Sequence, residues 1–141
     1  MNEFSDAFKA GINAAREVEF KRREIHSVLR EFSASLEVAT DGALAVEVKT
    51  LSTATSAFMA LLETTPKKQW LSVVTKATPV KSTPVAEWRQ SSEGYPCTVV
   101  TEGKESVCFD RISLQQELAR LAASPQMGEV IVQLMRPQEE P

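Results

Sequence analysis

The side chains that most often carry acid–base or nucleophilic chemistry are few in this chain. His26 is the only histidine, and Cys97 and Cys108 are the only cysteines. A catalytic triad or a two-histidine zinc motif would have to be built on His26, which has no metal-ligand pattern beside it. Neither cysteine opens a predicted helix or lies in a cationic cluster that would lower its pKa. We therefore expect a solvated or interface histidine and buried structural cysteines.

Carboxylates are the other candidates for chemistry. Asp110 ends a predicted strand and Glu105 lies on a predicted hairpin, but no spacing singles out a pair that could run hydrolysis or hold Mg²⁺. The chain also lacks GxGxxG, Walker, GxSxG and HExxH motifs, and its five glycines leave little material for a phosphate cradle. The sequence thus predicts a protein that is not an enzyme, with no cofactor and no metal site.

Basic residues gather in two places. Lys21, Arg22 and Arg23 form a trio with glutamates at ion-pair spacing, so a solvated helix face explains them well. Residues 64–86 hold four lysines, a tryptophan and no acid, and such a stretch could contact phosphates while the indole stacks on a base. Nucleic-acid binding is therefore the alternative function, through Lys67, Lys68, Trp70 and Lys76.

Length and composition bound the remaining classes. The chain has 141 residues, 43% of them apolar and 25% charged, which fits one soluble globular domain over residues 1–141. A net charge of −3 gives no global attraction to polyanions. No charged leader with an apolar run begins the chain, and no stretch approaches the ~20 apolar residues that span a bilayer. We expect a cytoplasmic protein that does not enter the membrane.

The N-terminal segment is predicted to form a long helix over about residues 5–31, because it lacks proline and is rich in alanine, glutamate, arginine and lysine. A helix of this length runs about 40 Å and would overhang a small domain. Eight residues are spaced alternately by four and three, the heptad rhythm of a helix that packs lengthwise on another surface. We call these residues the heptad seam: Phe4, Phe8, Gly11, Ala15, Val18, Arg22, Ile25 and Leu29.

Two interpretations of the heptad seam stay open. In one, an amphipathic helix covers its own sheet, and in the other the helix pairs with a second copy of the chain. Because Gly11 and Arg22 interrupt the rhythm, we expect one end to dock on the sheet and the other end to project. In the pairing hypothesis Arg22 fixes the register, and the interface consists of Phe4, Phe8, Ala15, Val18 and Arg22.

The sheet region is predicted over about residues 32–110, where apolar and polar residues alternate. Residues 32–49 are typical of a hairpin that turns at Thr40-Asp41-Gly42. A second hairpin over residues 95–109 turns at Thr101-Glu102-Gly103. In that register Cys97 faces Val107, and Cys108 points to the other side of the sheet, which disfavours a disulfide.

Between the hairpins the pattern is less regular. Residues 57–62 fit either a strand or a helix, and their length favours a strand. Residues 70–76 and 85–89 are predicted strands. Pro79 and Pro84 lie between them and indicate a loop or the crossing of a sheet edge.

The C-terminal helices are predicted over about residues 113–136, because Ser113 opens a capping box and Ser124-Pro125 is typical of a second helix start. The polar tail, residues 137–141, should fray. The predicted fold class is α+β: a long N-terminal helix, an antiparallel sheet of about five to seven strands built from hairpins, and one or two C-terminal helices.

The function that we expect is non-enzymatic protein binding by a homodimer that also binds an unidentified protein. Small acidic α+β chains are typical of bacterial or phage accessory proteins such as adaptors, inhibitors, immunity proteins and secretion chaperones. This expectation comes from size, charge and fold class, and a fold does not dictate a function.

Overall fold

The computed structural model describes residues 2–51 and 68–136. Its helices are α1 (Glu3–Ala39), α3 (Arg111–Ala122) and α4 (Pro125–Met135). Its strands form one five-stranded antiparallel sheet in the order β1-β2-β3-β4-β5. They are β1 (Leu44–Leu51), β2 (Lys68–Thr75), β3 (Ser82–Ser91), β4 (Gly94–Thr101) and β5 (Lys104–Cys108). The predicted α+β class is confirmed.

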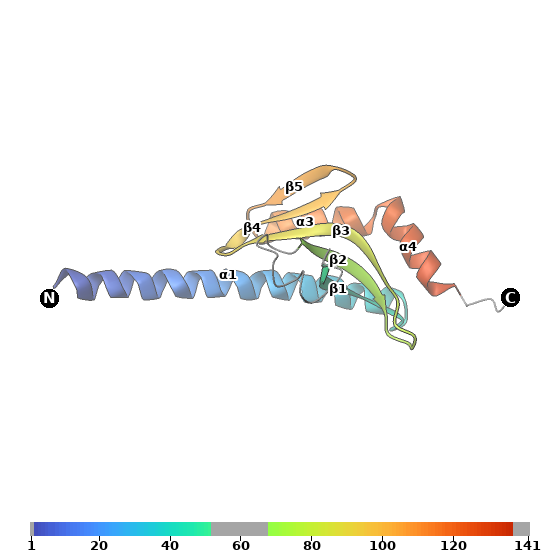
Figure 1. Ribbon diagram of the computed structural model, residues 1–141, viewed down its shortest axis with the longest axis horizontal. Coiled ribbons are helices and arrows are strands. Elements are labelled where there is room, and N and C mark those ends of the chain that lie inside the picture. Colours follow the sequence, from blue (N-terminus) through green and yellow to red (C-terminus); the bar gives the residue numbers. More distant parts are fainter. Residues whose placement is uncertain (1, 52–67, 137–141) are drawn as a thin grey trace, which may run out of the picture.

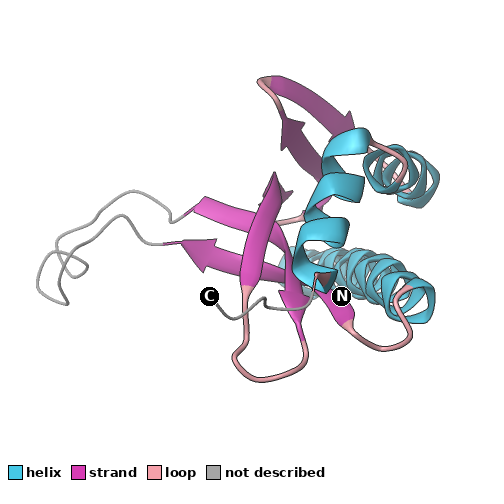
Figure 2. Cartoon of the chain, turned by 90° about the vertical axis from the view of Figure 1, so that its right-hand side faces the viewer, coloured by secondary structure: helices cyan, strands magenta, loops and turns pink. Residues whose placement is uncertain are grey.

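The helices form a layer against the sheet (Figure 2). Helix α1 contacts β1, β4 and α3, while α4 contacts β2 and β3 and α3 contacts β5. The sheet with α3 and α4 is called the body here. Only the C-terminal half of α1 lies along the body, and its N-terminal half extends beyond the sheet (Figure 1). The buried core lies between the layers and includes Ile25, Val28, Leu71, Val73, Trp88, Cys97, Val99, Leu114, Leu118 and Met127.

Helix α1 is longer than predicted, and the first strand of the predicted 32–49 hairpin is wrong. Residues 32–39 continue the helix, so the sheet begins at residue 44. Alternating apolar residues include pairs four apart, and such pairs also share one helix face. Phe32 and Leu36 use that face to pack on the core, whereas Val38, off the face, is 80% exposed.

The turn predicted for the hairpin instead ends α1. Asp41 adopts a left-handed conformation with φ of 52°, the Gly42 N–H donates to the Glu37 carbonyl at 2.7 Å, and the Asp41 N–H donates to the Val38 carbonyl. This pair of bonds is a Schellman cap. The Thr40 hydroxyl then accepts a hydrogen bond from the Leu44 N–H, so the cap leads straight into β1.

Strands β2 and β3 confirm the predictions for residues 70–76 and 85–89, with earlier starts at Lys68 and Ser82. Pro84 lies inside β3, where it faces Ser72 of β2 at a bulge, and the pairing of β3 with β4 begins only at Glu87. A proline can occupy this position because the other edge of β3 is not yet paired there. The predicted strand at residues 57–62 lies outside the described residues.

The second hairpin forms, but its predicted register is wrong by one residue. Glu102 and Gly103 both have positive φ, 48° and 78°, and form a two-residue turn that pairs Thr101 with Lys104. Two-residue turns of this handedness match the twist of the strands. As a result Cys97 faces Cys108, and both thiols are free and buried.

The two C-terminal helices are confirmed, with one difference at the first start. Asp110 is the N-cap of α3, and its carboxylate accepts from the Ser113 N–H at 2.8 Å while the Ser113 hydroxyl accepts from the Asp110 N–H. Ser113 is thus the third residue of the helix, not its cap. Ser124 caps α4 as predicted, with Pro125 in its first turn. The tail, residues 137–141, lies outside the described part.

Candidate protein-binding surface

Helix α1 has two halves with different surroundings. Residues 21–39, the covered half, lie along the body, and residues 3–20, the bare half, extend beyond it (Figure 1). With 37 residues the helix is about 55 Å long. Its only buried residues, Ile25 and Val28, both belong to the covered half. The bare half therefore has no buried residue of its own in the described part of the chain.

The body first meets α1 at residues 21–24. The Arg22 guanidinium donates to the Ser92 carbonyl in the turn between β3 and β4. Gly94, the first residue of β4, has φ of 100°, and a Cβ added there would lie 2.9 Å from the Lys21 Cβ. The β3–β4 turn thus approaches the helix backbone so closely that a side chain has no room.

Tyr95 fastens the same end of the body to the helix. Its hydroxyl donates to the Glu24 carboxylate at 2.8 Å. Burial of the phenol, followed by the hydrogen bond to Glu24, raises the pKa of Tyr95 well above its ordinary value. The hydroxyl therefore stays protonated and remains the donor.

The covered half continues the heptad seam into the core. Ile25 and Val28 are buried, and Leu29, Phe32 and Leu36 pack against the core cluster. The Ser33 hydroxyl accepts a hydrogen bond from the Val46 N–H at 3.0 Å, which ties this face of α1 to β1. After residue 21 the body thus covers the apolar face of α1, and before residue 21 the body does not cover it.

Most apolar side chains of the bare half face solvent. Phe4 is 74% exposed, Phe8 73% and Ile12 52%. Ala15 is also exposed, and Val18 is half-buried. Among the described residues, no hydrogen bond or ion pair joins residues 3–20 to the body. An amphipathic stripe of this kind is a candidate protein-binding surface.

The predicted interface residues fall into two groups. Phe4, Phe8, Ala15 and Val18 lie together on the bare half, whereas Arg22 is engaged with the body and marks the end of the free surface. Ile12 was missed, because it stands outside the alternating four-and-three rhythm. The spacing of four from Phe4 to Phe8 to Ile12 would have indicated it.

Charges of opposite sign flank the bare half. Its first turn carries Glu3 and Asp6. At its other end, the side chains of Glu19 and Ser27 line a shallow depression together with a group called the basic cluster, which consists of Arg22, Arg23, His26 and Arg30. Within this group Arg23 forms an ion pair with Glu19, and the Arg30 guanidinium lies 3.4 Å from the His26 Nε2. His26 thus lies on an exposed, charged part of α1.

The residues of the predicted nucleic-acid patch do not converge in the described part. Lys68 begins β2 and Lys76 follows the end of that strand, so the two are about 26 Å apart. The Lys76 ammonium forms an ion pair with Glu37 of α1 at 2.9 Å. Trp70, which lies between these two lysines in the sequence, is half-buried. Lys67 lies outside the described residues.

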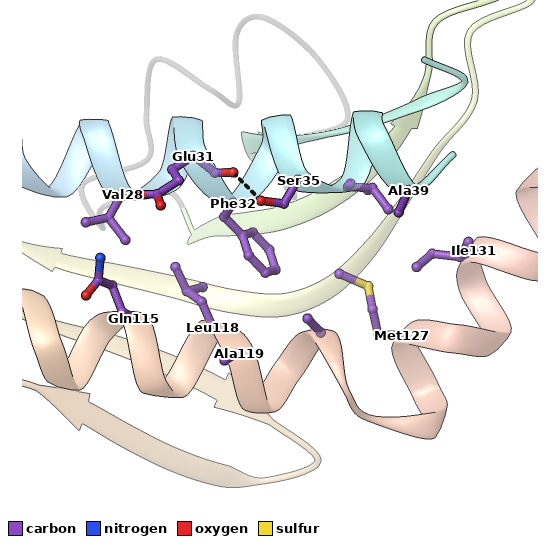
Figure 3. Close-up of a pocket in the computed structure, with 12 residues that line it drawn as sticks. Val28, Glu31, Phe32, Ser35, Ala39, Gln115, Leu118, Ala119, Met127 and Ile131 are labelled. Atoms are coloured by element: carbon purple, nitrogen blue, oxygen red, sulfur yellow. Dashed lines mark hydrogen bonds between the residues drawn. The ribbon is translucent and has the colours of Figure 1, made fainter. Parts of the chain in front are cut away.

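A second apolar surface lies between the covered half of α1 and the C-terminal helices. This groove has a volume of about 460 Å³. Phe32 and Leu118 face each other across it, Met127 and Ile131 close its α4 end, and Gln115 lies near Val28 at the other end (Figure 3). Several of its other lining residues are small, namely Ser35, Ala39, Ala119 and Ala122.

The cysteines and Asp110 have structural surroundings. Burial first, and then the neighbouring Cys108, raise the pKa of Cys97 to about 12, and burial also raises the pKa of Cys108. Thiols with raised pKa values are poor nucleophiles at neutral pH. The Ser113 N–H and hydroxyl lower the pKa of Asp110, as expected for a helix cap.

Over residues 2–51 and 68–136, no group of three or more His, Cys, Asp or Glu side chains is placed to hold a metal ion. None of the helices described is both long enough and apolar enough to cross a membrane. Comparison of the chain with known protein families, curated proteins and solved structures finds no match.

Proposed function

We propose that this chain is a cytoplasmic, non-enzymatic protein-binding module that forms a homodimer through the bare half of α1. The proposed contact residues are Phe4, Phe8, Ile12, Ala15 and Val18. One observation carries the proposal. Helix α1 continues for 18 residues beyond the body, and these residues carry an exposed apolar stripe that continues the heptad seam.

The energetic reason is that isolated helices of this length are marginal in water. Most helical stability in proteins comes from packing of the apolar face. A projecting stripe with two phenylalanines therefore favours cover by another polypeptide. A second copy is the simplest partner, because it brings an identical stripe and a two-fold contact is self-complementary.

The available area fits a modest dimer. Burying Phe4 and Phe8 of both copies would remove roughly 500–700 Å² of aromatic surface from water, given their exposure. Ile12, Val18 and the alanines of the stripe bring the total toward the ~1,000 Å² of a specific interface. The homodimer would then present two bodies, each with its own apolar groove, to a further protein.

The test is sedimentation of the unmodified chain and of two matched variants. Phe8→Asp should weaken association about 100-fold or more, because two charges enter an apolar contact that loses two rings. Phe20→Asp is the control, since Phe20 is 65% exposed but lies about 200° around the helix from Val18.

Circular dichroism should give the same folded content for both variants in dilute solution. Sedimentation of the unmodified chain as a monomer at all accessible concentrations would end the dimer proposal. Equal weakening by Phe8→Asp and Phe20→Asp would remove the heptad seam as its contact surface.

Nucleic-acid binding has less support. Lys68 and Lys76 lie at opposite ends of one strand, and Lys76 forms an ion pair with Glu37. A labelled oligonucleotide in low salt tests this alternative, which predicts binding that falls steeply as salt rises.

A further inference from the structure

We infer that Cys97 and Cys108 are a redox pair, which closes reversibly into one cross-strand disulfide and locks β5 to β4. They are the only cysteines of the chain, and the fold places them directly opposite each other on neighbouring antiparallel strands. The structure holds both as free thiols, which is the reduced form of the pair. The inference does not depend on the proposed homodimer, because neither cysteine belongs to α1.

The register of the second hairpin gives the pair the spacing that a disulfide requires. The two-residue turn pairs Thr101 with Lys104, and the pairing continues without a shift to Cys97 and Cys108. Residues that face each other in an antiparallel pair have Cα atoms about 4.5–5.5 Å apart and side chains on the same face of the sheet. A disulfide needs a Cα separation of about 4.4–6.8 Å. The reason against a disulfide rested on a three-residue turn, and it does not apply to this register.

The two side chains share one buried environment. Cys97 is 0% exposed and Cys108 is 1% exposed, and both belong to the core cluster. The Cys97 thiol donates to the Gly94 carbonyl at 3.7 Å, and the Cys108 thiol donates to the Ser106 carbonyl at 3.9 Å. Thiols are weak hydrogen-bond donors. Closing the disulfide therefore breaks only two weak hydrogen bonds.

The folded, reduced pair reacts slowly with oxidants. Burial raises the pKa of both thiols, and the carboxylates of Glu117 and Asp110 add to the rise at Cys108. Because the thiolate is the reactive form, both sulfur atoms stay unreactive while the strands are closed. Strand β5 has five residues and forms an edge of the described sheet. Local opening of a short edge strand costs less than global unfolding, and it exposes Cys108.

A low-molecular-weight disulfide is the oxidant that closes the pair. The Cys108 thiol loses its proton to water, and its thiolate attacks one sulfur of the oxidant, which releases one small thiolate and leaves a mixed disulfide. The Cys97 thiol then loses its proton, and its thiolate attacks the Cys108 sulfur and releases the second small thiolate. Both released thiolates take up protons. The two cysteines thus lose two electrons and two protons, and the oxidant gains them.

The disulfide fastens the strand that leads into α3. Only Phe109 and Asp110 separate Cys108 from the first residue of α3, Arg111. Helix α3 contacts α1 and lines the apolar groove. The junction of β5 and α3 is therefore free to open only while the pair is reduced. A reducing compartment keeps the pair as a dithiol, and oxidising conditions close it.

Equilibration of the full chain in a redox buffer tests the inference. The reduced chain is incubated with about 5 mM glutathione and about 0.5 mM glutathione disulfide, quenched with acid, denatured and treated with a maleimide. We expect more than half of the chains to carry no maleimide and no glutathione, and to have lost the mass of two hydrogen atoms. Dithiothreitol should then restore both reactive thiols. Chains whose two thiols stay free, or carry only glutathione, would overturn the redox pair.

A register control separates facing thiols from thiols that are merely close in sequence. Cys108→Ala combined with Val107→Cys keeps two cysteines and moves one of them to the position that faces Thr98, on the other side of the sheet from Cys97. Val107 is 46% exposed, so a cysteine has room there. We expect at least tenfold less internal disulfide in this variant. An equal yield in the two chains would contradict the facing register.

The closed form supplies the test of the lock. A disulfide that closes a loop of this length should raise the thermal midpoint by about 5–10 °C. Amide hydrogen exchange in β5 should be at least tenfold slower than in the reduced chain, because the edge strand no longer opens by itself. An oxidised chain with the midpoint and the β5 exchange of the reduced chain would show that the bond forms without locking the strand, and the lock would be wrong.

Discussion

The two halves of α1 share one pattern and meet different surroundings. In the covered half, Ile25 is buried under the body, and in the bare half, Phe8 is exposed to solvent 17 residues earlier in the same helix. The heptad seam therefore indicates that one face of the helix is apolar and favours burial. It does not indicate whether the same chain or another chain buries that face. The difference between the halves is set by the length of the sheet, because the body reaches only as far as residue 21.

Truncation of one seam residue in each half should give the largest contrast. Ile25→Ala should lower the free energy of unfolding by about 3 kcal/mol, because it leaves a cavity in the core. Phe8→Ala should change the unfolding of the dilute monomer by no more than about 0.5 kcal/mol. Urea denaturation at low protein concentration measures both. Similar losses for the two variants would mean that the bare half is covered by its own chain.

Alkaline pH should weaken the body and leave the bare half unchanged. The pKa of Cys97 is raised from 9.0 to about 12 on folding, so its contribution is complete below pH 9 and is lost as the pH rises toward 12. At pH 10.5 the loss from this thiol is about 2 kcal/mol. Denaturation across pH 8 to about 10.5 measures the slope, and Cys97→Ala should reduce it, leaving the part that comes from Cys108 and Tyr95, whose pKa values are also raised on folding. A flat profile in the unmodified chain would contradict the buried placement of the thiol.

Removal of one anchor should give a smaller effect on the covered half. Tyr95→Phe keeps the ring and loses the hydrogen bond to Glu24, which should cost about 1 kcal/mol of unfolding free energy. The lost bond joins two side chains and is not part of the helix backbone, so the helix content of the folded state should stay the same. Urea denaturation monitored by circular dichroism tests both statements, and an unchanged midpoint would show that the anchor contributes nothing.

The smallest expected effect lies in the bare half. Gly11→Ala should favour helix by about 0.5–1 kcal/mol and raise the far-ultraviolet ellipticity of the dilute chain. The added methyl should also weaken self-association by a few-fold, because Gly11 belongs to the heptad seam through which the proposed pair makes contact. Asn13→Ala, at an exposed position off the heptad seam, should raise ellipticity without that weakening.

Sequence reasoning predicted the helices and strands best where local signals agreed with tertiary packing. The heptad seam and the Ser124-Pro125 start required no knowledge of distant partners, and the structure contains both helices. The strand predicted for residues 32–38 was wrong because residues four apart lie on one face of a strand and also on one face of a helix. Only the contacts of Phe32 and Leu36 with the core decide between a strand and a helix there.

The candidate surface could be predicted in part. Phe4, Phe8, Ala15 and Val18 were grouped by spacing, but the role of Arg22 depends on Ser92, seventy residues later, and no local pattern contains that contact. The register of the second hairpin was missed for a related reason. A loop of two residues and a loop of three differ only in the backbone angles of Glu102 and Gly103, and the choice determines which residue faces Cys97.

The overhang of α1 has a length that can change without changing the body. In the proposed pair the contact runs along the bare halves, so its length depends on how many helical turns precede Lys21. Inserting one heptad between residues 11 and 18 would lengthen the bare half by about 10 Å and keep the apolar face in phase. The domain itself would be untouched, so evolution or design could tune the reach of the assembly independently of its fold.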